Sequence, residues 1–309
     1  MVDQVIKIAV VGVGKIVRDQ HLPTIAALPD YELVAAASRN ATVEGIENFQ
    51  DIDALLDARA DIQAVALCMP PQHRFVAAQR ALSAGVHVLL EKPPGATVSE
   101  VQQLQYLAND KGVSLFASWH SRHATGVALA KRWLADATIE AVQMRWHESV
   151  RKWHPGQEWI WQAGGLGVFD PGINGLSIAT HILPSALRLC SAELAFPANK
   201  QAPIAAQLSM RCGTADVAVS MDWATEGAEQ WEICCQTDKG QLKLAEGGAI
   251  LQIDGNDMTP DGACEYVGLY NHFSGLISNS QSDVDLSPLQ LTADAFLLGS
   301  RQTVDAFYD

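Results

Sequence analysis

Short apolar runs alternate with helix-forming segments over the first third of the chain. Five runs are too short for helices and end at turn residues or prolines: Lys7–Val11, Tyr31–Ala37, Ala64–Cys68, Val86–Leu90 and Val113–Ala117. Helical patterns lie between them at 51–60, 74–84 and 98–109, the last opening on a Thr97/Glu100 capping box. Strands joined by helical crossovers form a parallel sheet with right-handed connections, so residues 1–122 are predicted to form one α/β domain.

The pattern changes after Ala124. A helix is predicted at 126–137, followed by a long alternating strand at 139–150. Further segments of β character occur at 204–211, 216–221, 231–237, 240–244 and 249–253. Because short turns separate them, they are expected to form an open, mainly antiparallel sheet. A closing helix is predicted at 291–307, which can pack back on the first domain. Residues 123–309 are thus predicted to form a second α/β domain.

Composition narrows the range of partners. The 309 residues carry a net charge of −14, which argues against nucleic acid or an anionic membrane, because both attract basic surfaces. No apolar run approaches the roughly 18 residues that span a bilayer, so a cytoplasmic protein is expected. The six cysteines show no zinc-ligand spacing and are expected to be buried free thiols. His120 and His123 have no third ligand nearby in sequence, so no metal is predicted.

A glycine-rich turn follows the first strand. Gly12 permits a tight turn, and Gly14 lets a pyrophosphate reach bare N–H groups at the start of the next helix. Lys15 and Ile16 continue the turn. Val17 replaces the third glycine of the dinucleotide fingerprint, so the packing of helix on strand must adjust there. The pattern predicts a Rossmann-type domain that binds a dinucleotide; an ordinary strand–turn–helix is the alternative.

The end of the second strand bears on the choice of cofactor. NAD-specific proteins usually place an acid there, which binds the ribose 2′-hydroxyl, whereas this chain has Ser38-Arg39. Serine can donate a hydrogen bond to a 2′-phosphate, and arginine can pair with it. NADP is therefore the predicted cofactor, with NAD as the alternative. The alternative is that Arg39 has no role in binding and is an arginine in a solvent-exposed loop.

Two later strand ends extend the predicted cofactor edge. The turn Cys68-Met69-Pro70 leads to His73, which can contact a cofactor or cap the helix behind it. The run 86–90 delivers Glu91 and Lys92 immediately before a proline. Ligands of open parallel sheets lie beyond the carboxyl ends of the strands, so Lys92 is expected to lie at the reaction centre.

Two stretches of the second half combine polar with aromatic or helix-capping residues. The first contains Trp146, Glu148, Trp153 and His154. Aromatic faces beside hydrogen-bonding groups match a sugar, and core packing is the alternative for the tryptophans. In the second stretch, Asp170 stands at a predicted helix start, with Asn174 one turn further along the same face. From these residues alone, Asp170 is either a plain helix cap or a functional carboxylate.

Three motifs occur together: Gly12-Val13-Gly14, Glu91-Lys92-Pro93, and Asp170 four residues before a polar partner. With them the chain resembles the glucose–fructose oxidoreductase/inositol dehydrogenase family over nearly its whole length. The resemblance implies a Rossmann domain and a second α/β domain whose open sheet often forms a homo-oligomer interface. Family members usually carry histidine where Asn174 stands. The DPGIN form is similar to that of the D-galactose and L-arabinose 1-dehydrogenase branch, which oxidises the anomeric carbon of a pyranose to a lactone.

The resulting hypothesis is an NADP-dependent aldose 1-dehydrogenase acting on L-arabinose or D-galactose. Asp170 is the expected base, Asn174 orients the same hydroxyl, and Lys92 stabilises the developing negative oxygen or is the base itself. Cofactor contacts are expected from Gly12, Gly14, Lys15, Ile16, Val17, Ser38, Arg39, Cys68, Met69, Pro70, His73, Glu91, Lys92, His120 and Trp153. Substrate contacts are expected from Lys92, His120, Glu148, His154, Asp170 and Asn174. The alternatives are a non-catalytic NADP-binding sensor or regulatory protein, and a dehydrogenase acting on another polyol or sugar hydroxyl.

Overall fold

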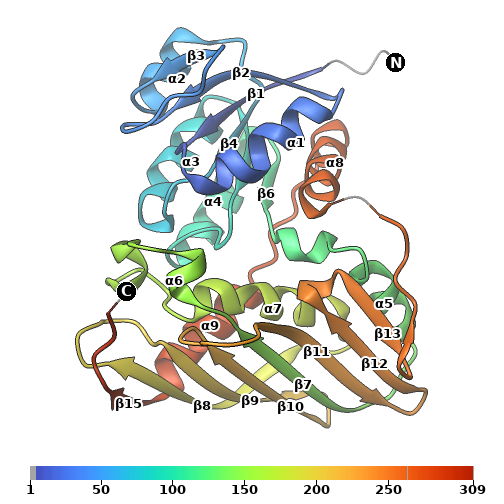
Figure 1. The fold of residues 1–309 in the computed structure, drawn as a ribbon. Coiled ribbons are helices and arrows are strands. Elements are labelled where there is room, and N and C mark those ends of the chain that lie inside the picture. Colours follow the sequence, from blue (N-terminus) through green and yellow to red (C-terminus); the bar gives the residue numbers. More distant parts are fainter. Residues whose placement is uncertain (1–4, 263, 309) are drawn as a thin grey trace. The chain divides into compact units, whose positions relative to one another are not determined.

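The computed structural model describes residues 5–262 and 264–308, which fall into two compact units (Figure 1). The first unit comprises the described residues up to Trp119 together with Tyr266–Leu286. The second comprises His120–Glu265 and the described residues from Ser287 onward. The first unit therefore contains a segment from far down the chain, which a single division of the sequence near residue 122 does not provide.

The first unit is built on a six-stranded sheet in the order β3-β2-β1-β4-β5-β6, with all strands parallel. Its strands are β1 (Ile6–Val11), β2 (Tyr31–Ala37), β3 (Glu47–Phe49), β4 (Ala64–Leu67), β5 (His87–Leu90) and β6 (Leu115–Ala117). The central strands are almost continuously apolar and buried, as expected for strands covered on both faces. The order reverses next to β1, the arrangement of a Rossmann domain, so the predicted fold of this part is confirmed.

Five helices accompany this sheet: α1 (Leu22–Ala27), α2 (Ile52–Ala58), α3 (Arg74–Ser83), α4 (Val98–Lys111) and α8 (Glu265–Ser278). The capping box that opens α4 is present as predicted. Helix α8, which the sequence reasoning did not anticipate, packs its Tyr270 and Phe273 side chains in one cluster with Val10 and Ile25. The chain after α8 then runs beside β6, where Asp283 exchanges backbone hydrogen bonds with Leu115 and Ala117. This late segment therefore completes both a face and an edge of the Rossmann sheet.

The second unit is built on a nine-stranded sheet in the order β14-β13-β12-β11-β7-β10-β9-β8-β15. Its strands are β7 (Ile139–His147), β8 (Leu187–Pro197), β9 (Ala205–Cys212), β10 (Ala215–Asp222), β11 (Gln230–Thr237), β12 (Gly240–Ala245), β13 (Ile250–Ile253), β14 (Asn256–Asp257) and β15 (Ser300–Val304). Among the described strands of this second sheet, only the β7/β10 and β8/β15 pairs are parallel. The prediction of a second α/β part with a mainly antiparallel sheet is thus confirmed.

Helices cover one face of this unit's sheet. The unit contains α5 (Val127–Leu134), the short α6 (Val150–Trp153), α7 (Phe169–Ile182) and α9 (Ser287–Leu298), of which α5, α7 and α9 pack on strands. Helix α7 packs on β7 and β11, and α9 packs on β8 and on α7 (Figure 1). Buried and exposed residues alternate along β9 and β10, so the other face of the sheet is open. The predicted open sheet therefore has one helix-covered face and one polar face.

The closing helix predicted at 291–307 is wrong beyond Leu298. Helix α9 ends there, and β15 follows, pairing in parallel with β8. Gly299 separates the two elements, and the residues after it lack an apolar helical face but find backbone partners on the edge of β8. Helix α9 belongs to the second unit, and its packing on the first domain stays a prediction. The helix that packs in the first unit is α8.

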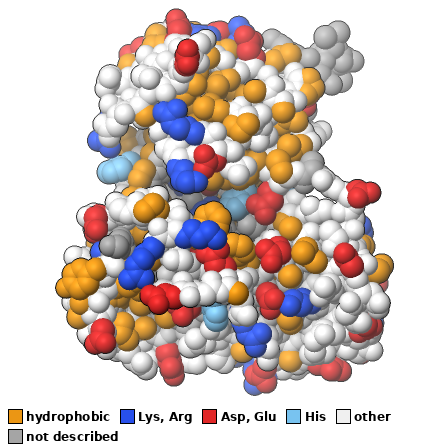
Figure 2. All heavy atoms as spheres, in the orientation of Figure 1, with side chains coloured by type: hydrophobic (Ala, Val, Ile, Leu, Met, Phe, Trp, Pro, Cys, Tyr) orange, Lys and Arg blue, Asp and Glu red, His pale blue; other side chains and the backbone are white. Residues whose placement is uncertain are grey.

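The structure shows how charged side chains, apolar helices and cysteines are distributed. Acidic and basic side chains are interspersed on the face of the molecule that Figure 2 shows. Within the described ranges, no helix is long and apolar enough to cross a membrane. All six cysteines are free thiols, as predicted, but only Cys212 and Cys235 are buried; Cys68 and Cys234 are partly exposed, and Cys190 and Cys264 are exposed. Cys190 is exposed because it lies on the open face of β8.

Candidate active site

The glycine turn after β1 closes against the turn after β4. Gly12 has a φ of +89°, and a Cβ added to it would lie 2.6 Å from the Met69 backbone nitrogen, so only glycine fits there. A Cβ added to Gly14 would meet nothing within 4 Å, which leaves open space over the turn. Bare backbone beside open space at the start of a helix fits the pyrophosphate of a dinucleotide.

The packing adjustment predicted at Val17 is visible. Val17 is fully buried and begins a π-helical turn, η1 (Val17–His21), which runs directly into α1. A π turn is wider than an α turn, and it gives room to the side chain that replaces the third glycine. Ile16 precedes this turn and is exposed.

Ser38 and Arg39 lie at the carboxyl end of β2, beside the glycine turn. The N–H of Ser38 donates to the Phe49 carbonyl, which fixes the start of the loop. Arg39 is exposed. Arg18 holds the same loop by donating to the Thr42 carbonyl at 3.2 Å.

Lys92 is held through its backbone by two buried neighbours. A carboxylate oxygen of Glu91, Oε2, accepts the Lys92 N–H at 2.6 Å. The guanidinium of Arg74 donates to the carbonyls of Met69, Glu91 and Pro93, and so ties the ends of β4 and β5 together. The position of Lys92 at the carboxyl edge of the sheet is thus fixed by side chains on either side of it.

His73 does not cap the helix behind it. It stands at the N-terminal boundary of α3 but makes no side-chain capping hydrogen bond, and it is exposed. The capping alternative for His73 is therefore wrong.

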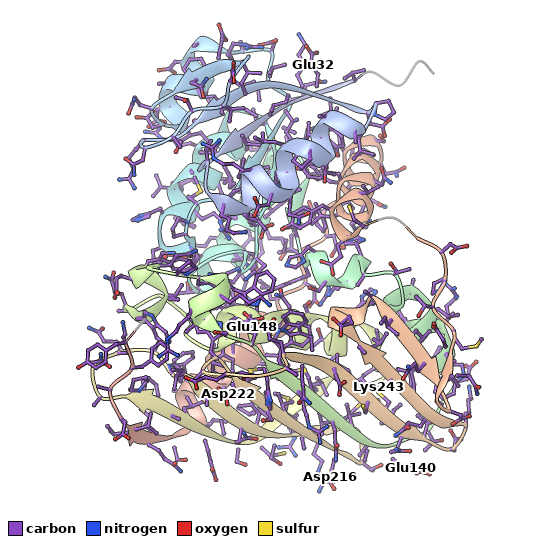
Figure 3. The ribbon with its side chains drawn as sticks, viewed as in Figure 1. Glu32, Glu140, Glu148, Asp216, Asp222 and Lys243 are labelled. Atoms are coloured by element: carbon purple, nitrogen blue, oxygen red, sulfur yellow. The ribbon has the colours of Figure 1, made fainter. Side chains whose placement is uncertain are left out.

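In the second unit, Glu148 is clamped by two tryptophans. It follows β7 and is buried, and its two carboxylate oxygens accept hydrogen bonds from Trp223 Nε1 at 3.1 Å and Trp231 Nε1 at 2.9 Å. Figure 3 shows Glu148 at the end of β7 opposite to Glu140, the exposed glutamate at the start of that strand. Both oxygens are therefore fixed in direction by neutral donors.

Asp170 lies beside this clamp and does not cap α7. The helix begins one residue earlier, at Phe169, and its cap position has no side-chain hydrogen bond. Asp170 is only 3% exposed, and its Oδ2 lies 3.6 Å from His154 Nε2. The His154 ring in turn packs edge-on against Trp223, with 5.3 Å between ring centroids. Glu148 and His154 thus both contact the Trp223 ring, and Asp170 lies on the other side of the contact with His154.

The rotation of α7 is set by small residues. A Cβ added to Gly175 would lie 2.6 Å from the Trp146 ring, and one added to Gly172 would lie 2.4 Å from Met221 Sδ. The glycine side of α7 therefore rests closely on the sheet. At about 100° per residue, Asp170 and Asn174 lie together on the opposite side of the helix. This confirms that Asp170 and Asn174 share a face.

Other predicted residues have structural partners. Trp146 is part of the buried core, which favours the packing interpretation for that residue. Trp153 is 37% exposed and donates through Nε1 to Glu229 Oε1 at 2.7 Å. His120 Nδ1 lies 2.6 Å from Glu265 Oε2. Among the described residues, no cluster of three or more His, Cys, Asp and Glu is arranged to hold a metal ion.

Sequence reasoning missed several residues that shape these sites: Arg74, Trp223, Trp231, Tyr266 and Tyr270. The two tryptophans flank the turn between β10 and β11, the two strands that pair with β7. A tryptophan at each neighbouring strand end was the available signal. The two tyrosines give no such local signal, because they approach the Rossmann sheet from a helix far along the chain.

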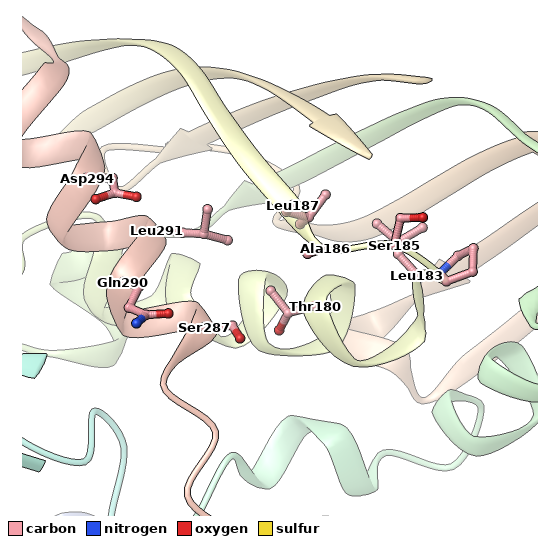
Figure 4. Close-up of a pocket in the computed structure, with 10 residues that line it drawn as sticks. Thr180, Leu183, Ser185, Ala186, Leu187, Ser287, Gln290, Leu291 and Asp294 are labelled. Carbon is pink, nitrogen blue, oxygen red and sulfur yellow. The ribbon is translucent and has the colours of Figure 1, made fainter. Parts of the chain in front are cut away.

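A pocket of about 400 Å³ lies elsewhere in the second unit. Thr180 of α7 and Ser287, Gln290 and Asp294 of α9 line it together with the chain at 183–187 (Figure 4). Thr180 is ten residues beyond Asp170, about 15 Å along the helix axis at 1.5 Å per residue. This pocket contains none of the predicted site residues and is distinct from the candidate site.

Comparison with known proteins agrees with this geometry. Residues 6–118 match a family model described as an oxidoreductase family with an NAD-binding Rossmann fold, GFO/IDH/MocA. A galactose 1-dehydrogenase from Pseudomonas fluorescens is 47% identical over 99% of this chain and 100% of its own length. The chain belongs to the GFO/IDH/MocA oxidoreductase family.

Solved structures show the same relationship. The crystal structure of a D-galactose-1-dehydrogenase from Rhizobium etli is 55% identical, with a TM-score of 0.94 over 98% of both chains. A 3-ketoreductase from Actinomadura kijaniata, solved with NADP and TDP-benzene, has a TM-score of 0.84 over 97% of this chain and 100% of its own, but is 17% identical and shares the fold alone. This family member therefore has both domains of these relatives.

Proposed function

We propose that the protein is an NADP-dependent aldose 1-dehydrogenase that oxidises the anomeric carbon of D-galactose or L-arabinose to the lactone. Two relatives that share about half of its residues over nearly the whole chain are named as galactose 1-dehydrogenases. The observation that carries the proposal is the burial of Asp170 and the nature of its neighbours. Asp170 is a buried carboxylate in the first turn of α7, 3.6 Å from a histidine that packs against Trp223 of the indole clamp.

The proposed chemistry assigns one role to each of three side chains. When bound, NADP⁺ supplies the hydride acceptor. Asp170 takes the proton of the anomeric hydroxyl as C1 loses its hydride and becomes a carbonyl carbon. Asn174, one turn along the same helix face, orients that hydroxyl, and Lys92 is assigned to stabilise the negative charge that develops on its oxygen. Lys92 as the base is the second candidate mechanism.

Glu148 and His154 are assigned to binding. Two indole N–H groups fix the direction of the Glu148 carboxylate, which is proposed to accept a hydrogen bond from a sugar hydroxyl. His154 contacts both Asp170 and Trp223 and can hold the base in place. The tryptophans beside them offer apolar faces for the C–H groups of a pyranose.

NADP is favoured over NAD because no acid follows β2. Ser38 and the exposed Arg39 stand where an acid would repel a 2′-phosphate. The remaining cofactor contacts are proposed at the glycine turn, at Cys68-Met69-Pro70, and at His73, Glu91, His120 and Trp153. Self-association through the open face of the second sheet is proposed as well.

The test follows nicotinamide absorbance with a panel of aldoses and both cofactors. We expect turnover with D-galactose or L-arabinose and a higher kcat/KM with NADP⁺ than with NAD⁺. Equal values for the two cofactors would contradict the argument from Ser38 and Arg39. No turnover with any aldose would favour the non-catalytic sensor or a dehydrogenase of another hydroxyl.

The assignment of the base is tested by Asp170→Asn, which keeps the shape of the side chain but cannot accept the proton. We expect kcat to fall at least about 100-fold, the usual scale for loss of acid–base catalysis. Asp216→Asn is the control, because Asp216 lies on the open face at the start of β10, with its side chain 76% exposed (Figure 3). Near-normal turnover of Asp170→Asn would leave Lys92 as the base.

A further inference from the structure

His21 is a buried histidine that the proposed chemistry does not use. It ends the π-helical turn η1 and is 0% exposed. Both ring nitrogens have partners: Nδ1 lies 2.7 Å from the Tyr270 hydroxyl, and Nε2 lies 3.2 Å from Glu91 Oε1. The Cys68 sulfur is 3.5 Å from Nε2. A π-helical turn is rare and often marks a functional position.

Glu91 connects this histidine to Lys92. Its Oε1 faces His21 and accepts a hydrogen bond from the Tyr266 hydroxyl at 2.5 Å, while its Oε2 accepts the backbone N–H of Lys92 at 2.6 Å. The carboxylate of Glu91 therefore has His21, Tyr266 and the backbone of Lys92 around it. Of these three residues, Lys92 is the one assigned to the reaction. Rotation of this carboxylate would release the Lys92 N–H.

The charge balance supports this connection. A carboxylate that is 3% exposed requires a compensating cation. Burial by itself lowers the pKa of His21, but the neighbouring Cys68 sulfur and Glu91 carboxylate outweigh burial and raise the pKa to about 10. An imidazolium donates from both nitrogens, to Glu91 at Nε2 and to the Tyr270 oxygen at Nδ1.

We propose that His21 is a positioning residue for Lys92, acting through the carboxylate of Glu91. His21 and Tyr266 hold one oxygen of the carboxylate, and the other oxygen holds the Lys92 N–H. Arg74 fixes the carbonyls on the other side of the same segment. The proposal rests on the proposed function in one respect, the role of Lys92 in the reaction. Displacement of a catalytic group by about 1 Å can lower a rate about 100-fold.

The test compares His21→Gln with His21→Phe in the full chain. Glutamine retains a donor for Glu91, whereas phenylalanine fills the space without one. We expect His21→Phe to lower kcat about 10- to 100-fold with the Kd of NADP⁺ changed less than about twofold, and His21→Gln to recover at least about fivefold of that loss. His87→Gln is the control, because His87 lies at the far end of the same strand, β5. Equal losses in the two His21 variants would overturn the proposal.

A second measurement does not depend on turnover. Backbone hydrogen exchange of the segment 89–95 should be faster in His21→Phe than in the wild type, and close to the wild type in His21→Gln and His87→Gln. Unchanged exchange in His21→Phe would overturn the proposal. If no aldose is oxidised, the proposed function fails, while faster exchange still supports the connection from His21 to Lys92.

Discussion

The two hydrogen bonds from indole N–H groups to Glu148 allow us to estimate how much a substitution of Glu148 changes the free energy of unfolding. Glu148→Gln keeps the length and shape of the side chain, but an amide has one acceptor oxygen where the carboxylate has two. One of the two indole N–H groups, from Trp223 or Trp231, must then face an NH₂ group. A hydrogen bond to a charged acceptor contributes about 1.5–3 kcal/mol, and a buried donor left unpaired costs about 1–3 kcal/mol. Since these terms overlap, we expect the substitution to destabilise the second unit by about 2–4 kcal/mol.

Urea unfolding followed by tryptophan fluorescence measures this effect. Of the eight tryptophans only Trp119 lies in the first unit, so the signal reports on the second. With a slope of about 2 kcal/mol per molar urea, the midpoint should fall by about 1–2 M. Glu140→Gln, an exposed change at the other end of β7, should stay within about 0.5 kcal/mol of the wild type. A midpoint for Glu148→Gln within about 0.2 M of the wild type would refute the clamp.

The other predictions concern pH and packing. The pKa of His21 is raised from 6.5 to about 10 in the folded chain, so its contribution to stability is fully present below pH 6.5 and is lost as the pH rises through about 10. The difference in Tm between the wild type and His21→Gln should therefore shrink between pH 7 and pH 10, and a constant difference would contradict this assignment. Gly175→Ala should lower stability by about 1–3 kcal/mol, because the new Cβ would lie 2.6 Å from the Trp146 ring. Gly275→Ala in α8 has nothing within 4 Å of its Cβ and should be neutral or slightly stabilising; similar Tm values for the two glycine variants would contradict the packing argument.

Local patterns were sufficient to predict the Rossmann sheet and the position of Lys92. The buried strands β1, β4 and β5 are continuous apolar runs followed by turn residues, and such runs carry their own signal. Asp170 and Asn174 were placed on one helix face by spacing alone. The exact start of α7 was not predicted, because an Asp-Pro pair suits a cap as well as the first turn.

What could not be predicted depends on partners distant in sequence. Trp231 is 83 residues from Glu148, and Tyr270 is 249 residues from His21. The strand β15 was taken for helix because its pairing partner β8 lies more than 100 residues away. Propensity and periodicity describe a segment by itself, whereas these features arise only when two segments meet.

The place of α8 in the first unit has a consequence for protein synthesis. Tyr266–Leu286 belong to that unit, and their side chains cover Val10, Ala36 and Phe116 of the Rossmann sheet. During translation the strands of this sheet therefore emerge before the helix that covers them, and the sheet keeps an apolar face open to water until residue 286 has left the ribosome. A fragment that ends near residue 122 would keep that face permanently and would aggregate. The sheet that carries the glycine turn is thus synthesised long before its apolar face is covered.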